Sequence, residues 1–195
     1  MSLRRTCQYL VTILLTSVCV ALCCDPNQCG SFGPWPQKYT PGPNRMIAMP
    51  DNTRLITDIY VPTGNGPWPV ILHRTPYNPD GAFWPAFHAG QVAEYNQAGI
   101  AYVVQNSRGH FGSQGKVDVF DHDRQDGRDM ITLLAAQSWC NGKIMMRGNS
   151  APGIESYFAA PNTNNSSANI AAAWVEVATP DLHSTVYQDG VFRKQ

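Results

Sequence analysis

Residues 144–153, with the sequence IMMRGNSAPG, constrain the fold of this chain more than any other stretch. An apolar run leads into Gly148, Asn149 and Ser150, and the following residues 151–160 are able to form a helix. This order of strand, tight turn, serine and helix is typical of a nucleophile elbow. A glycine shortly before the serine permits a sharp turn, and Pro152 suits the first helical turn because its missing N–H loses no hydrogen bond there. The alternative is an ordinary surface turn that contains a serine.

The rest of the chain predicts where such a serine lies. Besides the elbow strand, apolar or alternating runs predict strands at 45–49, 54–61, 69–74, 100–105 and 170–177. Helices are predicted at 86–98, within 121–138 and at 151–160. Two antiparallel strands are thus followed by strand–helix units, which predicts an α/β fold with a mostly parallel, doubly wound sheet. Ligands bind at the carboxyl ends of such strands, where residues 74–77, residues 106–110 and Ser150 are expected to converge.

Composition limits the class of protein. The chain has 195 residues, 43% of them hydrophobic, which is enough for one packed domain. Its 14 basic and 14 acidic side chains balance and form no run of like charge, which argues against a nucleic-acid partner. Metal-ligand spacings such as C-x-x-C and H-x-x-x-H are absent, so no metal and no other cofactor is expected.

The N-terminus has the three-part form of a secretory signal peptide. A basic head with Arg4 and Arg5 precedes an apolar run at 9–24, and small residues lie near a plausible cleavage point. We therefore expect a signal peptide at 1–23, an irregular arm at 24–44 and one domain at 45–195. The expected location is secreted, either extracellular or periplasmic, without membrane contact after cleavage; an uncleaved anchor is the alternative.

Cysteine usage is compatible with export. Cleavage would leave Cys24, Cys29 and Cys140, of which one pair is able to form a disulfide in an oxidising compartment. Residues 164–167 (NNSS) contain two overlapping glycosylation sequons, which are usable only in a eukaryotic secretory route.

Several ordered motifs resemble those of the X-Pro dipeptidyl-peptidase and cocaine-esterase-like (CocE/NonD) serine hydrolases. They are MPDNTRL at 49–55 with DIYVP at 58–62, HRTPY at 73–77, QNSRGHFGSQG at 105–115, DGRD at 126–129 and QSWCNGKI at 137–144. Each motif alone is weak, but the resemblance runs in order from about residue 45 to 181.

The resemblance implies an α/β-hydrolase in which Ser150 is the nucleophile and forms an acyl-enzyme with a small ester or an X-Pro peptide. It also implies an oxyanion hole made by the Tyr77 hydroxyl and the backbone N–H of Ala151. A donor aimed at a developing oxyanion lowers the barrier by roughly 2.7–4 kcal/mol. Arg108 is expected to tie the loop after the strand at 100–105 by hydrogen bonds rather than to act in catalysis.

The chain departs from the family pattern in two respects. Ala151 stands where the family usually has an aromatic residue, and the family's triad acid and base lie downstream of the region matched here. Asp181 and His183 are not expected to replace them. The histidines at 73, 88, 110 and 122 all precede the serine and carry no supporting motif. Histidines in loops and helices are more often solvated than catalytic, whereas His73 falls in a strand of the buried type.

We therefore expect these residues to be the N-terminal part of a hydrolase, nearly inactive alone, with an open sheet edge after the last strand. The alternative is a non-catalytic binding or interaction protein with the hydrolase fold. Substrate identity and oligomeric state are left open by the sequence.

Overall fold

The computed structural model describes residues 40–78, 84–160 and 169–192. Its first strands, β1 (Gly42–Ala48) and β2 (Arg54–Tyr60), pair antiparallel on either side of a tight turn. Side chains of β2 alternate between buried and half-buried, as the sequence pattern predicts. β1 begins slightly before the predicted domain start at residue 45. The predicted signal peptide and residues 24–39 of the predicted arm lie outside the described residues.

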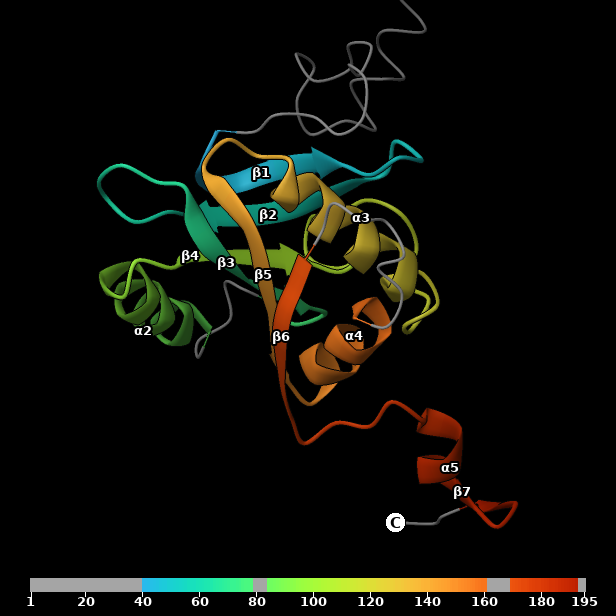
Figure 1. The fold of residues 1–195 in the computed structure, drawn as a ribbon. Helices are drawn as coiled ribbons and strands as arrows, with labels where there is room; N and C mark the ends of the chain where they lie inside the picture. The colour runs from blue at the N-terminus through green and yellow to red at the C-terminus, as the bar shows by residue number, and fades with distance from the viewer. Residues whose placement is uncertain (1–39, 79–83, 161–168, 193–195) are drawn as a thin grey trace, which may run out of the picture. The chain divides into compact units, whose positions relative to one another are not determined.

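The later strands of the sheet run parallel to one another. They are β3 (Trp68–Thr75), β4 (Ala101–Asn106), β5 (Cys140–Asn149) and β6 (Asn169–Glu176). The order across the sheet is β1-β2-β4-β3-β5-β6, with β2 antiparallel to β4. Because β4 and β5 flank β3 on opposite sides, their carboxyl ends meet that of β3 where the winding direction reverses (Figure 1). The predicted α/β class with a mostly parallel sheet is confirmed.

Helices cover both faces of this sheet. α3 (Asp123–Ala135) and α4 (Ala151–Ala159) pack against each other on one face, and α2 (Trp84–Gln97) lies on the other (Figure 1). The larger core cluster includes four fully buried residues of the apolar stripe of α3, namely Met130, Ile131, Leu133 and Leu134. The smaller one packs Tyr102 and its neighbours in the sheet against α2. This two-sided burial explains why β3 and β4 are nearly continuous apolar runs.

The last part of the described chain is more exposed. β6 pairs with β5, and no other strand among the described residues lies along its far side. Its Trp174 is 59% exposed. Beyond it come α5 (Leu182–Val186), β7 (Tyr187–Gln188) and β8 (Val191–Phe192). None of the helices within the described ranges has the length and apolar character needed to cross a membrane.

Candidate active site

Ser150 connects β5 to α4 with a backbone conformation that is rare for a residue with a side chain. Its φ of 61° and ψ of −126° lie outside the usual regions for residues other than glycine. Its N–H donates to the Glu176 carbonyl at 3.0 Å, and its own carbonyl accepts from the N–H groups of Gly153 at 2.9 Å and Ile154 at 3.0 Å. The turn is thus held from both sides. Strained residues held in this way occur most often at functional sites.

Two glycines allow α4 to pack closely against the sheet. A Cβ on Gly148 would lie 2.2 Å from the carbonyl carbon and oxygen of Pro152, and one on Gly153 would lie 2.7 Å from the Ala178 Cβ. The prediction that a glycine before the serine avoids a Cβ clash at the turn is confirmed by Gly148. Ser150 itself adopts the positive φ, whereas Gly148 makes room for the backbone of the helix.

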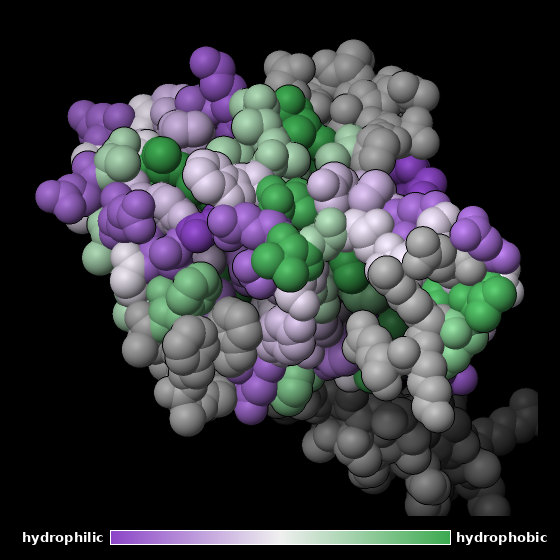
Figure 2. Space-filling view, turned by 90° about the horizontal axis from the view of Figure 1, so that it is seen from below, coloured by the Kyte–Doolittle hydropathy of each residue, from purple (hydrophilic) through white to green (hydrophobic). Residues whose placement is uncertain are grey.

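A cavity of about 460 Å³ lies beside this turn. Ser150, which is exposed, and Tyr77, which is half-buried, both line it. Its remaining lining residues come from β3, α2, β5 and β6: His73, Phe87, Arg147, Gly148, Asn149 and Glu176. Figure 2 views the side toward which β5 and β6 run, and hydrophobic residues gather near the middle of this face among hydrophilic ones. Such a mixed cavity suits a small organic ligand.

The two residues predicted to form the oxyanion hole come from different segments. Tyr77 follows β3; its N–H donates to Thr75 Oγ1 at 3.1 Å, and its carbonyl accepts from Asn106 Nδ2 at 2.9 Å. Ala151 is the first residue of α4, where backbone N–H groups have no acceptor within the helix. Both donors therefore lie at the edge of the sheet that holds Ser150, and their roles stay predictions.

His73 also lines this cavity, and the sequence analysis missed it. His73 is 4% exposed in β3, which the sequence predicts to be a buried strand, whereas the expectation of a solvated helix histidine is wrong for His88 of α2, which is 8% exposed. Burial, and next the neighbouring His88 ring at 5.4 Å between centroids, lower the pKa of His73 to about 3. The imidazole of His73 is therefore uncharged at neutral pH and only weakly basic. Its position inside an apolar strand run was the available signal of burial.

Asp181 and His183, which are not expected to serve as triad members, do not line this cavity. The Asp181 carboxylate caps α5 by accepting from the Ser184 N–H at 2.9 Å, and hydrogen bonds from Ser184 lower the pKa of Asp181. His183 stacks on Tyr187 with 5.2 Å between ring centroids. Within the described ranges, no histidine is hydrogen-bonded to the Ser150 hydroxyl, so no triad base is seen there.

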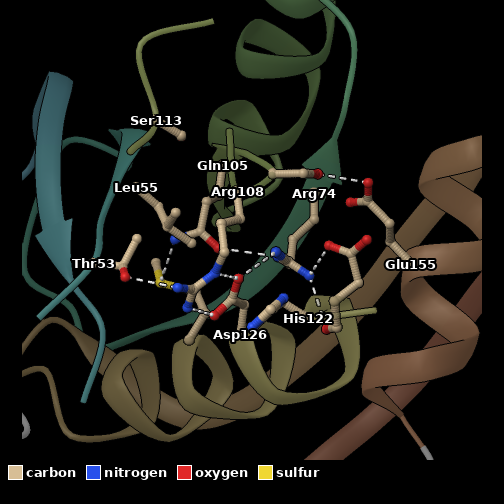
Figure 3. A network of polar contacts seen from close by, with 12 residues as sticks. Thr53, Leu55, Arg74, Gln105, Arg108, Ser113, His122, Asp126 and Glu155 are labelled. Atoms are coloured by element: carbon tan, nitrogen blue, oxygen red, sulfur yellow. Dashed lines mark hydrogen bonds and ion pairs between the residues drawn. The ribbon is translucent and has the colours of Figure 1, made fainter. Parts of the chain in front are cut away.

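Arg108 has the structural role that the sequence predicts. Its guanidinium donates to both carboxylate oxygens of Asp126, at 3.0 and 2.6 Å, and to Asp51 at 2.7 Å (Figure 3). It also donates to Thr53 Oγ1 at 2.7 Å. These bonds, led by those to Asp126, raise the pKa of Arg108. The side chain thereby fixes the β4 loop to α3 and to the turn between β1 and β2.

A second buried arginine, Arg74, belongs to the segment 74–77 that the sequence places at the strand ends, but its ion pairs were not predicted. It is completely buried at the end of β3 and contacts Asp123 Oδ1 at 3.0 Å and Gln105 Oε1 at 3.0 Å. Figure 3 shows it between Asp126 on one side and Glu155, which extends from α4, on the other. The available signal was an arginine at the end of an apolar strand, together with two acids three residues apart, Asp123 and Asp126, in the helix predicted within 121–138.

Other candidate ligand groups are weaker. Within the part of the chain that the structure describes, Asp118, Asp121 and His122 are close enough to share a metal ion, but the latter two are exposed and nothing else there points to a ligand. Cys140 is a buried free thiol, and burial raises its pKa. The other two cysteines that cleavage would leave, Cys24 and Cys29, lie outside the described residues, as do the sequons.

Comparisons with known proteins agree with this arrangement. The family described as X-Pro dipeptidyl-peptidase (S15 family) matches residues 51–195. Cocaine esterase from Rhodococcus sp. (strain MB1 Bresler) is 34% identical over 122 residues, which cover 63% of this chain and 21% of the esterase. The chain spans about a fifth of the length of the curated relatives it matches.

Solved structures give the same result for the fold. An α-amino acid ester hydrolase matches with a TM-score of 0.51 and 29% identity, over 59% of this chain and 22% of that one. A CocE/NonD family hydrolase from Staphylococcus aureus matches with a TM-score of 0.50 and 22% identity, over 60% and 24% of the two chains, which supports the fold alone. The resemblance stated from the sequence motifs is confirmed.

Proposed function

This chain belongs to the X-Pro dipeptidyl-peptidase (S15) family, and on that premise we propose that it forms part of a serine hydrolase that acts through an acyl-enzyme on Ser150. The proposed substrates are small acyl esters or X-Pro peptides, since relatives include esterases of this type. One observation carries the proposal: Ser150 combines a φ of 61° with a place in a cavity at the start of α4. A strained strand-to-helix serine of this kind has its hydroxyl available for attack.

The geometry suggests how the site would act. The Ser150 Oγ attacks the substrate carbonyl carbon, and the resulting oxyanion is stabilised by the Tyr77 hydroxyl, the Ala151 N–H and the positive end of the α4 dipole. Attack needs a base that accepts the hydroxyl proton, because an unassisted serine is a weak nucleophile at neutral pH. His73 is buried and too weakly basic for this role. The proposed mechanism therefore requires a base and an acid beyond those that the described residues offer.

A fluorophosphonate probe tests the assignment of Ser150. We expect the folded full-length protein to be labelled, and peptide mass spectrometry to place the label on Ser150. The Ser150→Ala variant should remain unlabelled, while Ser184→Ala, at an exposed serine of α5, should label like the wild type. Absence of label on a folded full-length protein would sink the proposal. A panel of p-nitrophenyl esters and X-Pro anilides then identifies the substrate class.

A non-catalytic ligand-binding protein is the second candidate. It is favoured by the Ser150 hydroxyl, which has no hydrogen-bonded histidine in the ranges 40–78, 84–160 and 169–192, and by Ala151 in place of an aromatic residue. This function predicts calorimetric binding of ester analogues by a full-length protein that neither reacts with the probe nor hydrolyses any substrate of the panel.

We also propose that the protein is exported and that residues 1–23 are removed. The basic head and apolar run of the N-terminus support this. N-terminal sequencing of the protein recovered from the medium or periplasm should begin near residue 24. Recovery with an intact N-terminus in the membrane fraction would instead indicate an uncleaved anchor.

A further inference from the structure

Glu155 is a completely buried carboxyl group on α4, the helix that begins directly after Ser150. Its Oε1 accepts a hydrogen bond from Ser107 Oγ at 2.6 Å (Figure 3). Its Oε2 has no hydrogen-bond partner among the described residues. A buried carboxyl with one strong hydrogen bond and one unpaired oxygen is costly, and this cost calls for an explanation.

The arginines near Glu155 are already paired with other acids, so its carboxyl has no cation of its own. Arg74 and Arg108 are already matched by the buried acids Asp123 and Asp126. The groups that face Glu155 across a small cavity of about 110 Å³ or through space are Arg74, Arg108, His110, Asp118, Asp123 and Asp126. Burial, only partly offset by Arg74, raises the pKa of Glu155 to about 8. The carboxyl is therefore mainly protonated at neutral pH.

The partner of Glu155 belongs to the segment that holds Tyr77. Ser107 directly follows β4, and its N–H donates to the Thr75 carbonyl at 2.9 Å. The preceding Asn106 Nδ2 donates to the Tyr77 carbonyl at 2.9 Å. The end of β4 thus fixes the backbone that bears the candidate phenol donor. Glu155 in turn belongs to the helix that bears the Ala151 N–H.

We propose that Glu155 is a positioning residue, whose hydrogen bond with Ser107 holds the α4 end of the oxyanion hole in place relative to the Tyr77 segment. The inference rests on the proposed function of Ser150 and adds to it a residue with no contact to substrate. Oxyanion donors act over distances of 2.7–3.1 Å, so small displacements matter. A displacement of about 1 Å costs roughly 100-fold in rate.

Variants of both partners test the link in the full-length protein. Glu155→Leu and Ser107→Ala each remove the hydrogen bond, and Glu155→Gln keeps an acceptor of the same size that does not ionise. We expect the first two to slow fluorophosphonate labelling of Ser150 by roughly 10- to 100-fold, with kcat falling and KM nearly unchanged on a p-nitrophenyl ester. The double variant Glu155→Leu/Ser107→Ala should be no slower than either single one. Glu155→Gln should recover most of the rate that Glu155→Leu loses.

The pH dependence separates positioning from general destabilisation. The labelling rate of the wild type relative to Glu155→Gln should depart from its neutral-pH value above about pH 8, where the Glu155 carboxyl ionises and its hydrogen bond with Ser107 becomes charge-assisted. The control Glu94→Leu, at an exposed position of α2, should leave the rate unchanged. A folded Glu155→Leu protein that labels at the wild-type rate would overturn the inference, and so would a constant ratio of wild type to Glu155→Gln from pH 6 to pH 10.

Amide hydrogen exchange decides the matter even if Ser150 proves unreactive. The N–H groups of Gly153 and Ile154, in the first turn of α4, should exchange faster in Glu155→Leu and Ser107→Ala than in the wild type or Glu155→Gln. A wild type that is never labelled removes the proposed hydrolase function but leaves this exchange difference to be measured. Unchanged exchange in both variants would overturn the positioning role.

Discussion

The positive φ of Ser150 costs about 1–3 kcal/mol for a residue that carries a Cβ. Glycine adopts this angle without strain, although it adds about 0.5–1 kcal/mol of unfolded-state entropy. We therefore expect Ser150→Gly to be about 1 kcal/mol more stable than Ser150→Ala, which keeps the Cβ and its strain. Both variants should lose fluorophosphonate labelling. Urea unfolding of the pair measures the difference, and equal stabilities would show that the turn is not strained.

Because His73 is buried in its neutral form, the free energy of unfolding is expected to fall as the pH falls. Its pKa is about 3 in the folded protein and about 6.5 when unfolded, so the unfolded chain binds the extra proton. The stabilising contribution of the neutral ring is complete above pH 6.5 and is lost as the pH falls from 6.5 toward 3. Between pH 6.5 and pH 3 we expect the free energy of unfolding to fall by about 1.4 kcal/mol per pH unit in the wild type and by much less in His73→Leu.

The control for this prediction is Val104→Ala, which truncates a buried, non-ionising side chain on the strand next to His73. Its free energy of unfolding should follow the wild-type pH dependence between pH 6.5 and pH 4. Parallel curves for wild type and His73→Leu in the same range would contradict the assignment, because they would show that His73 titrates equally in the folded and unfolded states.

Some residues of the candidate site lie in recognisable sequence motifs, whereas others are defined only by how distant segments pack. Ser150 and Tyr77 lie in local motifs with their own spacing, so the sequence could name them. The burial of His73 left a signal in its apolar strand run, whereas Glu155 could not be named, because its burial arises from packing between segments distant in sequence. A glutamate five positions after the serine looks like any helical surface residue until α4 is placed against Ser107.

At the scale of elements, the packing of α4 on β5 depends on Gly148. Any side chain there would meet the Pro152 backbone at 2.2 Å, and the backbone is unable to move aside as a flexible side chain would. We expect Gly148→Ala to destabilise the protein by about 1–3 kcal/mol and to displace the start of α4, with loss of labelling at Ser150. Gly90→Ala is the matched control, since no atom lies within 4 Å of the added Cβ in α2. It should be neutral or slightly stabilising by thermal unfolding.

The buried ion pair of Arg74 with Asp123 joins β3 to α3 and is the second contact between elements on which stability depends. Removing one partner of a buried ion pair leaves the other uncompensated and typically costs about 3–5 kcal/mol. We expect Arg74→Met to lose stability in that range at pH 7, because the buried Asp123 carboxylate then lacks its cation partner. The loss should shrink at pH 4, because burial raises the pKa of Asp123 and its protonation removes the unpaired charge. A loss that is the same at both pH values in denaturant titrations would exclude the electrostatic explanation.

Element order was readable from the sequence, because strand and helix periodicities alternate clearly from residue 45 to 177. Which strands become neighbours was less readable. The position of β3 between β4 and β5 follows from the reversal of winding, and no local pattern encodes it. That reversal is nevertheless what brings His73, Tyr77 and Ser150 to one cavity.

At the scale of the whole molecule, β6 is an edge strand of the sheet that carries an exposed aromatic side chain. Its Trp174 is 59% exposed, and with Ala171 and Ala172 it borders an apolar cavity of about 460 Å³ between β6 and α2. Among the described residues no strand pairs with its outer edge, and unpaired apolar edges promote association. We expect the 195-residue chain to self-associate at micromolar concentrations and Trp174→Lys to reduce this association, as measured by sedimentation velocity.

The control for this prediction separates the edge strand from exposed aromatic surface in general. Tyr187 is 42% exposed but lies in the small β7–β8 ribbon, so Tyr187→Lys adds the same charge without altering β6. If β6 drives association, only Trp174→Lys should shift the distribution toward monomer. An equal shift in both variants would instead indicate that net charge limits solubility, because each change adds one positive charge to a chain whose formal net charge is zero.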